Sequence, residues 1–118
     1  MNLILCFIKS LKKHLFIKNR YSTVYISELP DSIKEGKIYI LGEGESLWEA
    51  VLLCPCGCTE ILHMSLHKEG RPKWIVKGVG KKYITLTPSI WRKNGCRSHF
   101  FFKNGCIEWC KDSISNKI

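Results

Sequence analysis

Short apolar runs, separated by turn residues, follow one another from Tyr21 to Trp109. Runs of this length that are rich in β-branched and aromatic residues are typical of strands. Glycine, proline, asparagine and aspartate separate the runs, and Asn104-Gly105 is a strong hairpin signal. The pattern predicts eight strands, over Thr23–Ser27, Lys37–Leu41, Leu47–Leu53, Thr59–Leu66, Lys73–Lys77, Lys82–Thr87, His99–Lys103 and Cys106–Trp109.

Regularly spaced short strands predict a mainly β domain over residues 21–112, built as a small antiparallel sheet or an open barrel. Residues 1–20 differ, because Ile4, Ile8, Leu11 and Leu15 recur with helical spacing among basic residues. We expect an amphipathic basic helix docked on the domain, with membrane-surface or partner binding as the alternative. Residues 113–118 are expected to form a frayed tail.

The composition fits one domain with a modest core, since 118 residues include 45% hydrophobic positions. Seven cysteines are a high and odd count. The N-terminal apolar run is too short to span a membrane and has its charges on the wrong side for a signal peptide. We therefore expect a reduced, cytoplasmic protein without a transmembrane segment, in which clustered cysteines are metal ligands more often than disulfides.

Five candidate metal ligands lie in two short segments: Cys54, Cys56 and Cys58 in the first, Cys96 and His99 in the second. Alternate residues of an extended strand stand about 6.6 Å apart, whereas ligands of one tetrahedral zinc ion lie under about 4 Å apart. The chain must therefore bend, which the intervening proline and glycine permit. The spacing predicts one structural Zn²⁺ that joins two distant turns, as in zinc-ribbon-like sites.

The set of four zinc ligands is open at this point. One possibility combines Cys96 and His99 with two of the first three cysteines. The other uses all four cysteines and leaves His99 beside the metal site or in a catalytic role.

The formal net charge of +9 is uneven, since residues 68–103 carry ten basic groups and one acid. Basic surfaces attract nucleic acid, anionic lipid or acidic partners. Nucleic-acid binding is therefore an alternative function, and a solvated basic face without a dedicated partner is equally open. The candidate contacts with nucleic acid or a partner are Arg71, Lys73, Trp74, Lys77, Lys81, Lys82 and Arg97.

Familiar catalytic motifs are absent, among them H-E-x-x-H, G-x-S-x-G and the zinc deaminase signature. A zinc hydrolase or a Cys–His nucleophile enzyme would have to use His99 with Glu60, the only carboxylate near the cysteines in sequence. The sequence favours a structural over a catalytic metal site. We therefore expect a binding protein rather than an enzyme, with no catalytic residues.

Several motifs in order resemble a family: Cys54-Pro-Cys-Gly-Cys58, Trp74, Thr85-Leu-Thr-Pro-Ser-Ile90, Cys96-Arg-Ser-His99 and an aromatic strand to Trp109. The family comprises small bacterial and phage-borne zinc-binding proteins and is known as a domain of unknown function. The resemblance covers about residues 37–109. Because some members are encoded beside ubiquitin-like conjugation components, it implies a zinc-stabilised adaptor role in such a system, with protein partners.

Overall fold

The computed structural model of the protein describes residues 20–113. The helix predicted over residues 1–20 lies outside this range except for Arg20, as does the predicted tail after Ser113. Residues 20–113 form strands and no helix, which confirms the mainly β prediction. Consequently, no helix in this part of the chain is long and apolar enough to cross a membrane.

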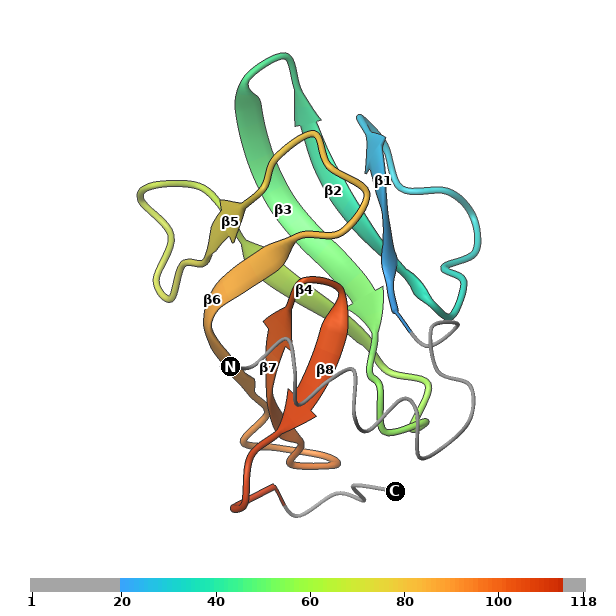
Figure 1. The fold of residues 1–118 in the computed structure, drawn as a ribbon, viewed down its shortest axis with the longest axis vertical. Coiled ribbons are helices and arrows are strands. Elements are labelled where there is room, and N and C mark those ends of the chain that lie inside the picture. Colours follow the sequence, from blue (N-terminus) through green and yellow to red (C-terminus); the bar gives the residue numbers. More distant parts are fainter. Residues whose placement is uncertain (1–19, 114–118) are drawn as a thin grey trace.

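Eight strands make up the domain, as predicted, with ends that shift by a few residues (Figure 1). They are β1 Ser22–Ile26, β2 Lys37–Glu43, β3 Ser46–Leu53, β4 Ile61–Ser65, β5 Ile75–Lys77, β6 Thr85–Trp91, β7 His99–Lys103 and β8 Cys106–Trp109.

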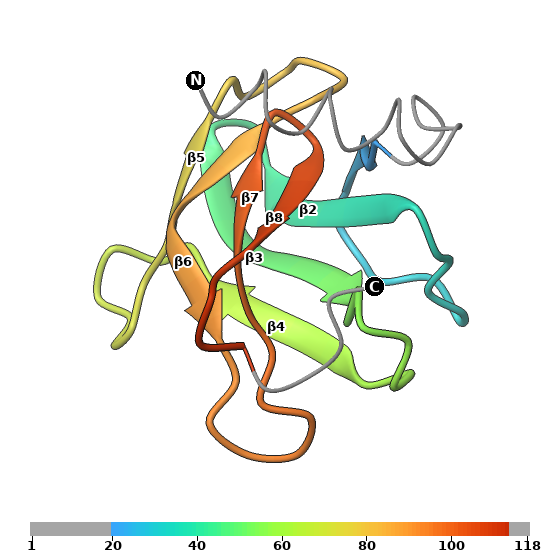
Figure 2. The same cartoon turned by 60° about the horizontal axis from the view of Figure 1, so that its bottom comes forward.

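The strands form two four-stranded sheets, ordered β1-β2-β3-β4 and β5-β6-β7-β8 (Figures 1 and 2). The second sheet is antiparallel throughout, whereas β1 pairs in parallel with β2. This architecture differs from the predicted single antiparallel sheet or open barrel. Parallel neighbours need a connection that returns the chain to its starting end, and residues 27–36 provide it.

One apolar core lies between the two sheets. The first sheet contributes Ile38, Ile40, Ala50, Leu52, Leu62 and Met64, and the second contributes Leu86, Ile90, Phe100 and Phe102. A smaller cluster covers the other face of β2 and β3, where Leu29 and Ile33 of the long connection pack on Tyr39, Leu41 and Val51. The two central strands are therefore buried on both faces, which explains their nearly continuous apolar sequences.

The core should depend most on its large aromatic side chains. Phe100 is fully buried, while Phe101, the next residue along β7, faces the other side and is 36% exposed. We expect Phe100→Ala to lower the free energy of unfolding by about 3–5 kcal/mol, because it leaves a cavity between the sheets. The matched variant Phe101→Ala should cost about 1 kcal/mol or less. Urea denaturation of both variants measures the difference, and equal losses would contradict this packing.

Two connections meet at one end of the molecule. The turn between β3 and β4 and the loop between β6 and β7 reach the same end in both views (Figures 1 and 2). The first carries three cysteines, and the second runs from the end of β6 to His99 at the start of β7. The candidate chemistry of the chain is concentrated here.

Candidate active site

Ser89 lies in an irregular part of β6. Leu86 pairs with Phe102 and Ile90 pairs with Phe100, so that β6 has three residues where β7 has one. Pro88, which has no N–H for the ladder, falls inside this bulge. The carbonyl oxygen of Ser89 accepts a hydrogen bond of 3.3 Å from the indole N–H of Trp74. The bulge and this hydrogen bond fix the backbone that carries the hydroxyl.

His99 lies beside Ser89 on the neighbouring strand. The distance from Ser89 Oγ to His99 Nε2 is 3.0 Å. On the other side of the ring, His99 Nδ1 lies 2.6 Å from Asp112 Oδ1. Because a carboxylate accepts hydrogen bonds, Nδ1 carries the proton and the Nε2 lone pair faces the serine hydroxyl. The serine, histidine and aspartate thus form one continuous hydrogen-bonded chain.

Backbone contacts hold the segment after β8 against His99. The backbone N–H of Cys110 donates to the His99 carbonyl at 2.9 Å. The Ser113 hydroxyl in turn accepts the His99 N–H at 3.1 Å. Asp112 lies between these two contacts, so its carboxylate is brought to Nδ1 although its side chain is 56% exposed.

The imidazole of His99 is also held through its face. The Trp91 ring stacks on it with a centroid distance of 4.4 Å and an interplanar angle of 6°. Trp91 and His99 are cross-strand partners, so the β6–β7 register creates this contact. Only 13% of the His99 side chain is exposed. The ring is therefore restrained in the orientation that joins Ser89 to Asp112.

This arrangement can perform nucleophilic catalysis. A serine hydroxyl at hydrogen-bond distance from a histidine that is itself oriented by a carboxylate is the Ser-His-Asp constellation of acyl-transfer enzymes. The constellation recurs on unrelated folds with different chain orders, so geometry defines it. Here the order is Ser89, His99, Asp112.

Cys110 is a thiol near this site but not its nucleophile. Burial raises the pKa of the Cys110 thiol, and the carboxylates of Asp112 and Glu108 raise it further. The thiol is therefore protonated near neutral pH and weakly nucleophilic. Ser89 is the group that faces Nε2.

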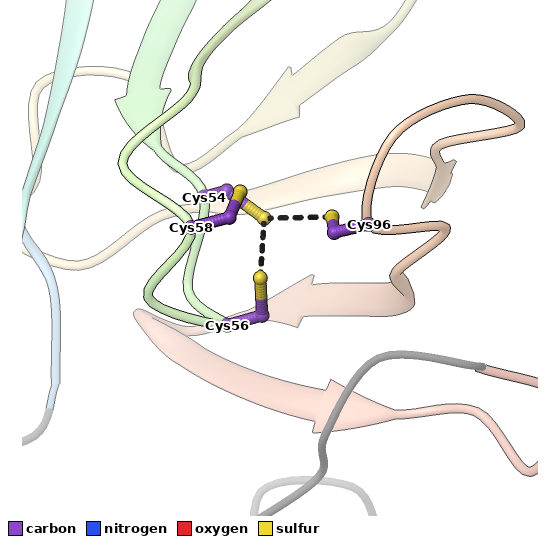
Figure 3. A group of neighbouring side chains, drawn as sticks. All are labelled: Cys54, Cys56, Cys58 and Cys96. Carbon is purple, nitrogen blue, oxygen red and sulfur yellow. Dashed lines mark hydrogen bonds between the residues drawn. The ribbon is translucent and has the colours of Figure 1, made fainter.

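The four cysteines of the two predicted segments come together in space, as Figure 3 shows. The sulfur atoms of Cys54, Cys56, Cys58 and Cys96 all lie within 4.8 Å of one another. The Cys54 sulfur is 3.5 Å from that of Cys56 and 3.6 Å from that of Cys96. These separations exceed a disulfide bond and approach the roughly 3.8 Å between thiolates on one tetrahedral zinc ion. The donor set therefore fits a metal ion.

The first three cysteines are brought together by a tight turn after β3. The N–H of Gly57 donates to the Cys54 carbonyl, and the N–H of Cys54 donates to the Glu60 carbonyl. Gly57 has a φ of 93°, in the left-handed region that a residue with a Cβ rarely adopts. The expectation that this glycine lets the chain bend agrees with the observed geometry.

Arg92 and Ser98 surround the sulfur cluster. The Arg92 guanidinium lies 3.3 Å from the Cys96 sulfur, and the Ser98 hydroxyl lies 3.1 Å from it. Burial raises the pKa of Cys54 to about 12. Burial also opposes ionisation of Cys96, but hydrogen bonds from the Ser98 hydroxyl and backbone outweigh it and lower the pKa of Cys96. A metal cation must displace the protons of such thiols when it binds.

The structure separates His99 from the other predicted ligands. His99 groups with Cys110 and Asp112, not with the four cysteines. Of the two ligand sets that the sequence leaves open, the geometry corresponds to the all-cysteine set. Ser98 links the two groups of residues, since its side chain contacts the cysteine cluster and its neighbour is His99.

The predicted basic contact residues lie at two ends of the second sheet. Lys81 and Lys82 precede β6, whereas Arg97 lies in the loop that follows it. Arg71, Lys73 and Lys77 are exposed in and before β5. Trp74 is partly buried among core residues and donates its indole N–H to Ser89, so its side chain serves the candidate active site.

Sequence reasoning missed Ser89 and Asp112. Ser89 stands within the motif Thr85–Ile90, but the absence of G-x-S-x-G gave no reason to assign it chemistry. Asp112 stands at the end of the predicted domain and is one of two aspartates in the chain. Their only sequence signal is proximity to His99, since all three residues fall within 24 positions.

Within residues 20–113, the fold and site define an all-β domain with the side chains of a serine hydrolase. The chain belongs to the BubE family, described as a bacterial ubiquitination-like system serine protease, whose match covers residues 25–110. Family membership associates it with a bacterial ubiquitination-like system, in agreement with the resemblance noted from the sequence. No curated protein and no solved structure matches the chain.

This family assignment corrects one expectation. The prediction of a binding protein rather than an enzyme is wrong, because the family is described as a serine protease family. The prediction relied on missing sequence motifs. A catalytic triad is a spatial arrangement of three side chains, which no fixed sequence pattern has to accompany.

Proposed function

We propose that this protein is a serine protease that cleaves peptide bonds in a protein of a bacterial ubiquitination-like system. The observation that carries the proposal is the hydrogen-bonded chain from Ser89 through His99 to Asp112. The family description supports the choice of a protease among serine hydrolases. The substrate belongs to the same system because that is the setting in which the family is described.

Acylation begins with attack of Ser89 Oγ on the carbonyl carbon of the scissile peptide bond. His99 Nε2 accepts the hydroxyl proton as the new C–O bond forms. Asp112 stabilises the resulting imidazolium through the hydrogen bond at Nδ1. His99 then donates the proton to the departing amine, the C–N bond breaks, and an acyl group remains on Ser89.

Deacylation uses the same groups in reverse. A water molecule takes the place of the departed amine, and His99 Nε2 removes one of its protons as it attacks the acyl carbon. Collapse of the intermediate breaks the ester bond and returns the proton to Ser89 Oγ. The products are the carboxylate and amine ends of the cleaved substrate, and the protein is regenerated.

We also propose that the four cysteines hold a structural zinc ion. Four protein thiolates fill the tetrahedral sphere of zinc, which is typical of structural sites. The ion would join the β3–β4 turn to the loop that connects the strand of Ser89 to the strand of His99. Such an ion would supply folding energy to this end of the domain, and all steps of the proposed reaction use Ser89, His99 and Asp112.

A fluorophosphonate probe tests the proposed nucleophile without knowledge of the substrate. Such probes react with serine hydroxyls that a neighbouring base activates. We expect one adduct per chain, located on Ser89 by mass spectrometry, and none in Ser89→Ala. The nearby variant Ser98→Ala provides a serine control, although it also removes contacts with the cysteine cluster. Labelling of another serine, or its absence in folded protein, would contradict the proposal.

A further inference from the structure

A second group of metal-ligating side chains lies at the catalytic base. One ligand atom each of His99, Cys110 and Asp112 lie within 4.8 Å of one another. This group is distinct from the cysteine cluster, and the proposed function uses two of its members but gives the Cys110 thiol no role. A thiol beside a histidine–carboxylate pair therefore remains to be explained.

Strand pairing explains why the three side chains meet. Phe100 pairs with Trp109, so the next step of the antiparallel register sets His99 opposite Cys110. The N–H of Cys110 donates to the His99 carbonyl, which continues the ladder by one residue. Phe100 and Trp109 are core residues, and because side chains alternate along a strand, His99 and Cys110 share the outer face. The following turn adds Asp112.

We propose that His99, Cys110 and Asp112 form a reversible binding site for a zinc-class divalent cation, and that occupation of this site switches the protease off. Imidazole nitrogen, thiolate sulfur and carboxylate oxygen are all zinc ligands, and water can take the fourth position. The metal site stands on the geometry alone, whereas its inhibitory effect rests on the proposed function.

The site can accept an ion after small movements of its side chains. Ligand atoms on a tetrahedral zinc ion stand roughly 3.3 Å apart when nitrogen and oxygen are the donors. His99 Nδ1 and Asp112 Oδ1 are now 2.6 Å apart, so they must separate slightly. The Asp112 side chain is more than half exposed and follows the last strand, which leaves room for this rotation. His99 keeps its stacking on Trp91.

Metal binding would disable the base through the tautomer of His99. In the free protein the proton is on Nδ1, and Nε2 has the lone pair that accepts the serine proton. A metal ion bound to Nδ1 replaces the proton there and uses the Nδ1 lone pair. The neutral ring must then carry its proton on Nε2. Nε2 then cannot accept the proton of Ser89. The Cys110 thiol gives up its proton on ligation, so one proton is released for each ion bound.

The inhibition test compares the rate of fluorophosphonate labelling of Ser89 with and without added zinc. The starting material is full-length protein that already holds one equivalent of zinc. At free zinc tenfold above the dissociation constant, about a tenth of the wild-type rate should remain. In Cys110→Ala the ratio of the two rates should stay near one at the same zinc concentration. Taking the ratio removes any effect of the substitution on the rate without zinc.

His63→Ala is the matched control. His63 forms another histidine–carboxylate pair, with Nδ1 2.9 Å from Glu49 Oε2, and it belongs to no three-ligand group within residues 20–113. Zinc should therefore inhibit this variant as strongly as the wild type. Full labelling of the wild type at saturating zinc would overturn the inference, and so would undiminished inhibition of Cys110→Ala.

Cobalt binding separates this inference from the proposed function. In Ser89→Ala preloaded with one equivalent of zinc, added Co²⁺ should give a thiolate charge-transfer band that is lost when Cys110 is also replaced by alanine. If this band forms but Ser89 of the wild type never labels, the proposed function fails and the metal site stands. If Ser89 labels but no such band forms, the metal site fails and the proposed function stands.

Discussion

The Asp112→Asn variant is expected to lose about four orders of magnitude in the rate of acyl transfer. The asparagine amide can donate a hydrogen bond to His99 Nδ1, where the carboxylate only accepts. The ring then places its proton on Nε2, facing Ser89, and can no longer act as a base. The rate of ester hydrolysis, or of fluorophosphonate labelling at Ser89, measures the loss.

Asp31→Asn is the natural control, because Asp31 is the only other aspartate in the chain. It is exposed in the connection between β1 and β2, so the same change of charge should leave the rate unaltered. His99→Ala should lose still more, about six orders of magnitude, since the base itself is removed. A folded Asp112→Asn protein with the wild-type rate would exclude Asp112 from the reaction.

Removal of the proposed zinc ion from the four cysteines is expected to lower the stability about as much as the loss of the Phe100 side chain. With free zinc a thousandfold above its dissociation constant, binding stabilises the native state by about 4 kcal/mol. For a domain of about 100 residues this corresponds to a fall of roughly 16–32 °C in Tm when the metal is removed. Differential scanning calorimetry of reduced protein, with one equivalent of zinc and after chelation, measures the shift.

Cys54→Ser should abolish this metal-dependent shift, because it removes a buried ligand at the centre of the cluster. Cys110→Ser should preserve it, because Cys110 is a free cysteine outside the cluster. Metal analysis should find one tightly bound zinc in Cys110→Ser and none in Cys54→Ser. A metal-free, reduced wild-type protein that melts at the temperature of the zinc-loaded protein would remove the structural role of the ion.

The proposed catalytic residues and the proposed four-cysteine zinc site lie at the same end of the domain, so this end would serve both catalysis and stability. The loop between β6 and β7 carries Cys96 and ends at His99, and the N–H of Arg92 donates to the Ser98 carbonyl across its base at 2.7 Å. A loop released from the metal would loosen the start of β7. We therefore expect chelation to reduce the activity of Ser89 even below the melting temperature.

The sequence by itself determined the local features of this protein. Apolar runs and turn residues located all eight strands, because alternation and chain reversal depend on neighbours in sequence. The three cysteines around Pro55 and Gly57 could be predicted to bind one metal ion together, because they are close in sequence and these two residues permit a tight turn. Cys96 could be added as a candidate ligand because Cys96-x-x-His99 has the spacing of a second pair of metal ligands.

Only the tertiary structure decided which distant side chains meet. The choice between a ligand set that includes His99 and one made of all four cysteines depends on how the loop before β7 enters the strand. The contact between Ser89 and His99 depends on the β6–β7 register and its bulge. The contact with Asp112 depends on the turn after β8. Periodicity assigns a residue to a face of a strand, but hydrogen bonds between strands select its neighbours, and those neighbours make Ser89 the proposed nucleophile.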